Sequence, residues 1–309
     1  MKNIIKNYLP YNYNLLKEDL ILLKNKYHNF YIGNIGKTVL GEDIKYLKLG
    51  NGKNKVFVNA SHHANEWISS LVIMMFVEKY LYLKNNYVDN YKSYNINELW
   101  KNSTLYVVPM VNPDGVNLVL GVDNFNKQEL YKDIWGKYVD KLEYWKANIR
   151  GVDLNLNYPF GFEQAKINKA KKGVISVGPR DYTGINSLSE PETIAMYNFS
   201  KLYKFDITIS LHSQGKEIYW DAGKEKLSTA YELGKFFEKV SGYILTKPEY
   251  NSSFAGYKDW SVNELQNIGY TIELGKGEEG KSLSLRNVDK IYNEVEEIFL
   301  KVLEFQNDI

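Results

Sequence analysis

The sequence predicts a single α/β domain with three layers, in which helices cover both faces of a mixed, mostly parallel and twisted sheet. Two observations predict it. Short strand-like runs alternate with longer runs at helical spacing, and no internal repeat or low-complexity linker divides the 309 residues. The composition, with 44% hydrophobic and 25% charged residues, is that of an ordinary globular protein and excludes a disordered or collagen-like chain.

The first part of the chain predicts a leader, one helix and two strands. Residues 1–12 look like an N-terminal leader, and a single domain is expected over residues 13–309. Leucines at roughly helical spacing predict a helix over residues 14–27. Alternating apolar residues predict a strand over 44–49, and a short apolar run predicts a buried strand over 55–60.

The rest of the chain continues the alternation of helices and strands. A long apolar run predicts a helix over 67–84, and residues 103–111 indicate a strand that Pro109 bends. Pro191, in a first turn, favours a helix over 190–203. The remaining expected elements are strand 206–211, helix 226–243, strand 269–273 and a terminal amphipathic helix 287–305.

Charge and cysteine content exclude several classes of partner and site. Lys+Arg 39 against Asp+Glu 37 gives a net charge of +2, so no basic face for nucleic acid is expected. The absence of cysteine excludes disulfides, thiolate metal sites and cysteine nucleophiles. The N-terminus has no apolar core of signal-peptide length, and the apolar stretch 68–76 is too short to span a bilayer. We therefore expect a cytoplasmic protein with no membrane or nucleic-acid partner, and the oligomeric state stays open.

Polar side chains stand where four predicted strands end. They are His62, His63, Asp114, His212 and Glu273. In open α/β sheets, ligands bind outside the carboxyl ends of the strands. If these strands are parallel neighbours, the side chains converge on one crevice.

Two imidazoles and one carboxylate near these strand ends suit a metal ion. His63 and Glu66 are three positions apart at a strand-to-helix turn, so both side chains are able to reach one ion. Zinc accepts histidine nitrogen and carboxylate oxygen, and a catalytic zinc keeps three protein ligands, which makes His212 the third candidate. The alternative is that the histidines are hydrogen-bonded core residues and the short motif arose by chance.

Three further charged residues are candidates for chemistry. Glu273 closes an apolar strand, where burial would raise its pKa towards that of a useful base, and the alternative is a salt bridge to a lysine. In the polar stretch 148–158, Asp153 is a candidate for orienting a metal-bound imidazole and Arg150 for stabilising negative charge. Alternatively, this stretch is an Asx-rich loop that satisfies its own backbone.

Six short motifs occur in an order that resembles a known family. They are ASHHANEW from residue 60, NPDG from 112, RGVDLN from 150, SEPET from 189, LHSQG from 211 and YTIELG from 270. Their order resembles that of zinc carboxypeptidases of the carboxypeptidase A type, from about residue 11 to the end. The first motif in particular resembles the bacterial γ-D-glutamyl-L-diamino acid endopeptidases, which cut cell-wall peptides.

The resemblance implies a zinc carboxypeptidase-like catalytic domain over residues 13–309 that binds one Zn²⁺ ion. The positions that match the family's site are the metal ligands His63, Glu66 and His212, the catalytic Glu273, Asp153 behind the first histidine ligand, Arg150 as the group that polarises the carbonyl, and Asn155 as a substrate-binding amide.

The match departs from the family at positions that bind substrate. Leu156 stands where the family carries the arginine that grips a terminal carboxylate together with Asn155, so that bidentate clamp is missing here. Tyr250 matches the family's mobile tyrosine if one residue is inserted, and Tyr257 competes for that role. Arg180, or a lysine, is the candidate cation for a substrate carboxylate.

The expected function is that of a zinc-dependent peptidase, which hydrolyses amide bonds with a metal-activated water. The resemblance implies a peptide substrate, in particular the γ-D-glutamyl-diamino acid bonds of peptidoglycan peptides. Three alternatives stay open: a conventional metallocarboxypeptidase, a non-catalytic peptide- or glycan-binding module on the same fold, and a zinc deacylase that acts on small N-acyl compounds.

Overall fold

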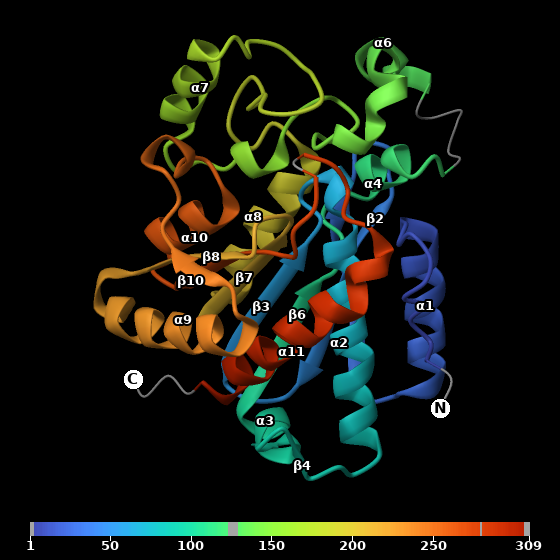
Figure 1. Ribbon diagram of the computed structural model, residues 1–309, viewed down its shortest axis with the longest axis vertical. Helices are drawn as coiled ribbons and strands as arrows, with labels where there is room; N and C mark the ends of the chain where they lie inside the picture. Colours follow the sequence, from blue (N-terminus) through green and yellow to red (C-terminus); the bar gives the residue numbers. More distant parts are fainter. Residues whose placement is uncertain (1–2, 123–128, 279, 306–309) are drawn as a thin grey trace.

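A computed structural model describes residues 3–122, 129–278 and 280–305 of the chain (Figure 1). The strands are β1 (Phe30–Lys37), β2 (Asp43–Gly50), β3 (Asn54–Ala60), β4 (Asn90–Tyr91), β5 (Tyr94–Asn95), β6 (Ser103–Val108), β7 (Ile207–His212), β8 (Glu217–Ala222), β9 (Ile244–Thr246) and β10 (Ile268–Glu273). The α-helices are α1 (Tyr13–Lys26), α2 (Ile68–Asn85), α3 (Ile96–Asn102), α4 (Pro113–Val119), α6 (Lys132–Trp135), α7 (Phe162–Lys171), α8 (Pro191–Tyr203), α9 (Leu227–Ser241), α10 (Tyr257–Leu265) and α11 (Val288–Glu304).

The main sheet has eight strands in the order β1-β2-β6-β3-β7-β10-β8-β9. Its centre is parallel, because β3 pairs in parallel with β6 and β7, and β7 pairs in parallel with β10. The pairs β1–β2, β2–β6 and β8–β10 are antiparallel, whereas β8 and β9 are parallel. This topology confirms the predicted mixed, mostly parallel sheet.

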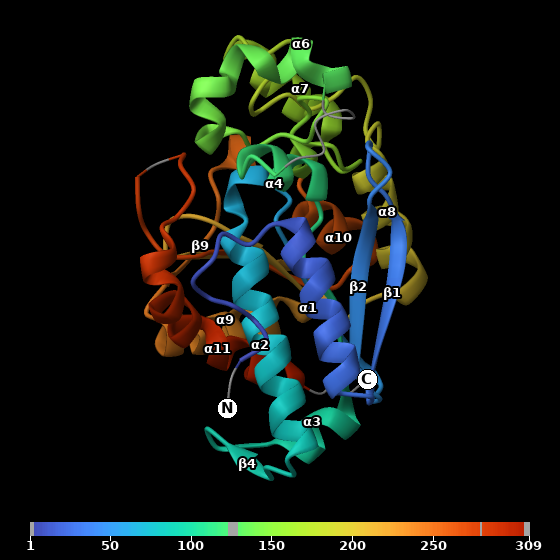
Figure 2. The ribbon, with the colours of Figure 1, turned by 90° about the vertical axis from the view of Figure 1, so that its right-hand side faces the viewer.

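The side-chain alternation of β3 assigns its residues to two cores, one on each face of the sheet. Val56 and Val58 join the apolar core that includes residues of α2 and α11, whereas Phe57 joins a second core with residues of α8 and α10. Figure 2 shows the β1–β2 edge with α2 on one side and α8 on the other. The predicted three-layer α/β/α domain is therefore confirmed.

Nearly all predicted elements lie within two residues of the observed ones. The exception is the strand predicted at 103–111, which ends at Val108. Pro109 follows it, and proline has no amide hydrogen to donate to a neighbouring strand. The elements that were not predicted include the strands β1 and β8 and the helices α7 and α10.

The described part of the predicted leader, residues 3–12, forms no helix or strand but lies against the core. Ile5 and Tyr11 are almost fully buried. The backbone amides of Ile4 and Ile5 donate hydrogen bonds to the Glu78 carboxylate on α2, at 2.8 and 2.9 Å. The boundary at residue 12 stays a prediction.

Three neighbouring parallel strands end at the same edge of the sheet. The last residues of β3, β7 and β10 are Ala60, His212 and Glu273. Figure 1 shows the green and yellow-green segments, which include α6 and α7, gathered over this edge. The fold thereby brings together residues that are about 210 positions apart in the sequence.

Candidate active site

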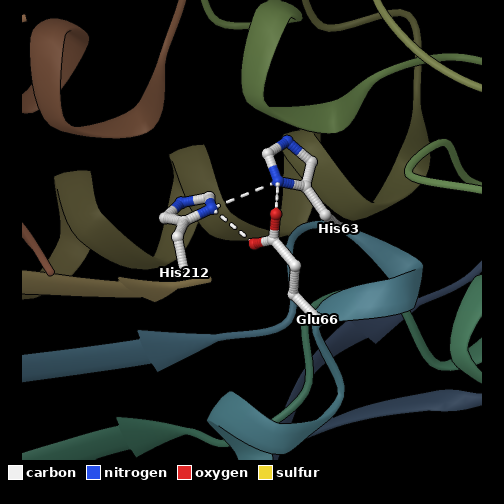
Figure 3. Close-up of side chains that lie close together, drawn as sticks. All are labelled: His63, Glu66 and His212. Atoms are coloured by element: carbon white, nitrogen blue, oxygen red, sulfur yellow. Dashed lines mark hydrogen bonds and ion pairs between the residues drawn. The ribbon is translucent and has the colours of Figure 1, made fainter. Parts of the chain in front are cut away.

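Two imidazoles and a carboxylate face one another at this edge (Figure 3). His63 Nδ1 lies 2.9 Å from Glu66 Oε1, and His212 Nδ1 lies 3.0 Å from Glu66 Oε2. The two Nδ1 atoms are 3.2 Å apart. All three side chains are buried, and one possible ligand atom from each lies within 4.8 Å of the others. We call these three residues the His-Glu-His cluster.

The backbone between β3 and α2 turns sharply to present this cluster. Ser61 has a φ of +51°, a conformation that non-glycine residues rarely adopt. Its amide donates to Ser69 Oγ, and its hydroxyl is 2.7 Å from Ser70 Oγ, so the start of α2 holds the turn. The short 3-10 helix Ala64–Glu66 follows, which places His63 and Glu66 on one side.

The Asp153 carboxylate lies on the far side of the His63 ring from Glu66. Its Oδ1 is 3.1 Å from His63 Nε2, so the Nε2–H tautomer of the ring would donate to Asp153 and leave the lone pair of Nδ1 for a metal ion. Burial alone raises the pKa of Asp153, but the nearby charges of His63 and Lys146 hold it below the usual range. Asp153 therefore stays ionised and orients the imidazole.

The cluster has the properties of a cation site. Burial alone lowers the pKa of His63, and the Glu66 and Asp153 carboxylates overcome this effect and raise it to about 9. The same excess of negative charge attracts a metal ion. Two imidazole nitrogens that face one carboxylate form a donor set that zinc accepts. His63, Glu66 and His212 are therefore able to hold one ion.

Glu273 lies beside His212, because the two residues are register partners in the β7–β10 pair. Burial raises the pKa of Glu273, and the negative charge of Glu66 raises it further, whereas His212 and Lys146 act in the opposite direction. Among the described residues it makes no ion pair with a lysine, the alternative that the sequence left open. A partly buried carboxylate with a raised pKa suits proton transfer.

Lys146 also reaches the cluster, although the sequence did not single it out. Its Nζ lies 3.1 Å from Glu66 Oε1, and its side chain is only 19% exposed. Burial alone lowers the pKa of Lys146, but Glu66 and Glu273 raise it above its ordinary value, so the ammonium group keeps its charge. Lysine is so common in this chain that residue type gave no signal, and only the folded contact identifies this one.

Arg150 and Arg180 do not lie in the cluster. The guanidinium of Arg150 is 3.7 Å from Glu190 Oε2, and its side chain lines a different pocket with Tyr131. The structure therefore does not place Arg150 where a scissile carbonyl beside the cluster would lie. Arg180 is exposed, and its Nε lies 3.4 Å from Asp181 Oδ2.

A pocket of about 440 Å³ opens beside Glu273. Its lining residues are Lys146, Asn155, Tyr219, Pro248, Glu249, Ser252, Gly256, Lys258, Asp259, Thr271 and Glu273. The structure thus places Asn155 in the lining of the pocket beside Glu273. Asn155 Oδ1 accepts a hydrogen bond from the Tyr257 amide, which leaves the Asn155 NH₂ group for a ligand.

The two candidate tyrosines have opposite environments. Tyr257 is fully buried, and its hydroxyl is 2.8 Å from Ser200 Oγ. Tyr250 is 77% exposed and follows Glu249, which lines the pocket. A side chain that moves onto a substrate must be free of the core, so Tyr250 is the candidate that fits.

Two other strand-end residues serve the fold. His62 Nε2 is 2.9 Å from the Tyr158 hydroxyl, and burial lowers the pKa of His62, so its ring is neutral. Asp114 accepts hydrogen bonds from the Thr38 hydroxyl and the Leu40 amide. The expected convergence of all five strand-end residues therefore holds for His63, His212 and Glu273 only.

Comparison with known proteins gives this site its family. The sequence profile of the zinc carboxypeptidases matches residues 17–299. The chain belongs to the zinc carboxypeptidase family. It is a zinc metallopeptidase, hence a hydrolase, and its family uses one Zn²⁺ ion. These findings confirm the predicted family, enzyme class and cofactor of this zinc carboxypeptidase.

Two curated relatives share more than a third of the aligned residues with this zinc carboxypeptidase. The γ-D-glutamyl-L-diamino acid endopeptidase 1 of Lysinibacillus sphaericus is 36% identical over 291 residues, which are 94% of this chain and 71% of the relative. The uncharacterized protein YqgT of Bacillus subtilis (strain 168) is 37% identical over 278 residues, 88% of this chain and 71% of the relative.

Solved structures share the fold at lower sequence identity. The crystal structure of thrombin activatable fibrinolysis inhibitor superposes with a TM-score of 0.75 at 19% identity, over 98% of this chain and 76% of that one. This likeness supports the fold assignment alone. In the part of the chain that the structure describes, no helix combines the length and apolar character needed to cross a membrane.

Proposed function

We propose that this zinc carboxypeptidase hydrolyses the bond between the γ-carboxyl group of D-glutamate and the α-amino group of a diamino acid in cell-wall peptides. The observation that carries the proposal is that the His-Glu-His cluster lies beside Glu273, which lines a pocket of its own. The relative named as a γ-D-glutamyl-L-diamino acid endopeptidase supports the choice of substrate.

In this proposal, His63, Glu66 and His212 are the zinc ligands, and Asp153 holds His63 in the required tautomer. When bound, the ion polarises a carbonyl group and lowers the pKa of water. Glu273 takes the proton from the attacking water and passes it to the leaving amine. Its raised pKa supports this role, because a carboxylate that binds a proton more readily is a better base.

We assign the stabilisation of negative charge on the substrate's carbonyl oxygen to Lys146 in place of Arg150. The Lys146 ammonium group is mostly buried beside Glu66 and lines the same pocket as Glu273. A fixed positive charge in a site that excludes water stabilises a developing oxyanion more strongly than it would in bulk solvent. Asn155 and the exposed Tyr250 are proposed to bind the substrate beside it.

A conventional metallocarboxypeptidase is the second candidate function. Leu156 provides no cation for a terminal carboxylate, but Lys258 lines the pocket and is able to supply one. An endopeptidase tolerates residues after the diamino acid, whereas a carboxypeptidase requires a free carboxylate on it. The two functions therefore differ in whether a peptide that continues beyond the diamino acid is cleaved.

Mass-spectrometric mapping of cleavage products tests the proposal. The substrates are L-Ala-γ-D-Glu-diaminopimelate, the same peptide extended by D-Ala, and blocked dipeptides with a free C-terminus. We expect cleavage of both γ-D-glutamyl peptides and its loss with a chelator. The Glu273→Gln variant should keep its zinc and lose turnover by at least about 10²-fold. Cleavage of the blocked dipeptides alone would establish the second candidate, and full turnover by the zinc-loaded variant would contradict the role of Glu273.

A further inference from the structure

The pocket beside Glu273 is lined by polar and charged groups. Among its lining residues, only Pro248 and the ring of Tyr219 are apolar. Such a lining offers little to an aliphatic or aromatic side chain, whose binding depends on the burial of apolar surface. The pocket therefore suits a ligand group with charges of its own.

Lys258 and Asp259 form a buried ion pair in this pocket. Lys258 Nζ lies 2.7 Å from Asp259 Oδ1, and the two side chains are 8% and 11% exposed. An ammonium group has three donors, and a carboxylate has a second oxygen. No further hydrogen bond of Lys258 Nζ or of Asp259 Oδ2 is found in the described ranges, so one cation and one anion both have free hydrogen-bonding capacity here.

Two glycines keep this ion pair accessible. A Cβ atom on Gly256 would lie 2.9 Å from Asp259 Oδ2, so the missing side chain leaves space at that oxygen. A Cβ atom on Gly269 would lie 2.9 Å from Lys258 Cγ, so this glycine lets the lysine stem pack against β10. Thr271 and Glu273 alternate onto the same face as Gly269, and both line the pocket. The pocket thus runs along β10 from Glu273 to the ion pair.

We propose that this pocket binds the far end of a diaminopimelate-type residue, with Lys258 binding its second carboxylate and Asp259 its second ammonium group. The inference rests on the proposed function and specifies the diamino acid. A side chain that ends in both charges matches the free capacity of the ion pair, whereas lysine offers only the ammonium group. A substrate that lacks either charge leaves part of this free hydrogen-bonding capacity unused and makes one charged hydrogen bond fewer.

Three tripeptides that differ only in the far end of their last residue test the proposal. They are L-Ala-γ-D-Glu-X, where X is meso-diaminopimelate, L-lysine, which lacks the second carboxylate, or L-2-aminopimelate, which lacks the second amine. For the wild-type protein with zinc, we expect kcat/KM for the diaminopimelate peptide to exceed both others by at least about tenfold, the effect of one lost charged hydrogen bond.

Single substitutions should change these ratios selectively. In the Lys258→Met variant, kcat/KM for the diaminopimelate and lysine peptides is expected to differ by no more than about threefold. The substitution removes the group that binds the second carboxylate. Asp259→Asn should likewise reduce the difference in kcat/KM between the diaminopimelate and aminopimelate peptides. The matched control is Lys92→Met, which breaks another partly buried ion pair, with Glu296, at the β4–β5 hairpin. This control should keep the wild-type ratios.

The outcomes separate this inference from the proposed function. If the wild type cleaves none of the three peptides, the proposed function fails. If it cleaves all three at similar rates, the proposed function stands and the role of the ion pair is refuted, without any variant. A Lys258→Met protein with unchanged ratios, or one that is folded but inactive on all three peptides, would also overturn the assignment of Lys258 to the second carboxylate.

Discussion

Lys146 and Arg150 lie four positions apart and face different parts of the molecule. Asn148 organises a tight turn between them, in which its Oδ1 accepts hydrogen bonds from the amides of Arg150 and Val152. Gly151 has a φ of +74°, which glycine adopts without strain. The turn directs the two cations to separate sites, so the sequence alone did not indicate which of them faces the cluster.

At the same scale, the role of Lys146 predicts a large loss of turnover on substitution. Lys146→Met should lower kcat by about 10²- to 10³-fold, the cost of removing one group that stabilises an oxyanion, while zinc content stays at one ion per chain. Arg150→Met is the matched control, because its ion pair with Glu190 lies outside the pocket. Steady-state kinetics with zinc analysis checks both. Equal losses in the two variants would contradict the assignment.

At the scale of elements, apolar patterns predicted the strands that carry the cluster, but not the helix that completes the pocket. β3, β7 and β10 are buried runs, and sequence reasoning placed their ends within one residue. α10 has only nine residues, begins without a side-chain cap, and buries polar as well as apolar side chains. Its sequence lacks the one-sided pattern of an amphipathic helix, so the pocket residues Lys258 and Asp259 were not predicted.

Two strands that the sequence did not predict lie near the sheet edges. β1 contains Gly33 and Gly36 and buries only Phe30 fully, and only two of the six residues of β8 are buried. Strands of this kind lack the apolar run or the strict alternation that identifies buried strands. Recognition of zinc ligands from ordered motifs succeeded because residue type and order are properties of the sequence, whereas the contacts of Lys146 depend on the fold.

The start of α8 holds a buried acid that makes stability depend on pH. Burial raises the pKa of Glu192 from 4.5 to about 8, and the charge of Asp114 adds to this effect. The folded protein therefore binds a proton that the unfolded chain releases above about pH 4.5. The contribution of Glu192 to the free energy of unfolding is fully present below about pH 4.5. It is lost as pH rises towards 8, at up to about 1.4 kcal/mol per pH unit.

Glu192→Gln should remove this dependence, because glutamine stays neutral at every pH in the window. We expect the free energy of unfolding of the variant, relative to wild type, to increase between pH 5 and pH 8 by a few kcal/mol at most. Urea unfolding at pH 5, 6.5 and 8 measures it, with the exposed Glu163 on α7 substituted by glutamine as control. If the free energy of unfolding changed with pH in the same way in wild type and in Glu192→Gln, Glu192 would not be the origin of the pH dependence.

At the scale of the whole molecule, two apolar cores hold the sheet between its helix layers, and the cluster sits above them at the strand ends. The cores consist of residues that are independent of the cluster, such as Val56 and Val58 on one face and Phe57 on the other. The cluster in turn joins the loop after β3 to the end of β7. We therefore expect the fold to persist without the ion, and a bound ion to cross-link two distant parts of the chain.

Removal of zinc should consequently abolish hydrolysis and lower thermal stability while the fold remains. An ion that binds only the folded state adds RT ln(1 + [Zn²⁺]/Kd), which is about 2.7 kcal/mol at a hundredfold excess over Kd. Dialysis against a chelator should leave the far-ultraviolet circular dichroism at 25 °C unchanged and lower Tm by several degrees. Restored zinc should recover both Tm and turnover, and a His212→Ala variant should show no such recovery. Unfolding of the metal-free protein at 25 °C would show instead that the cores need the ion.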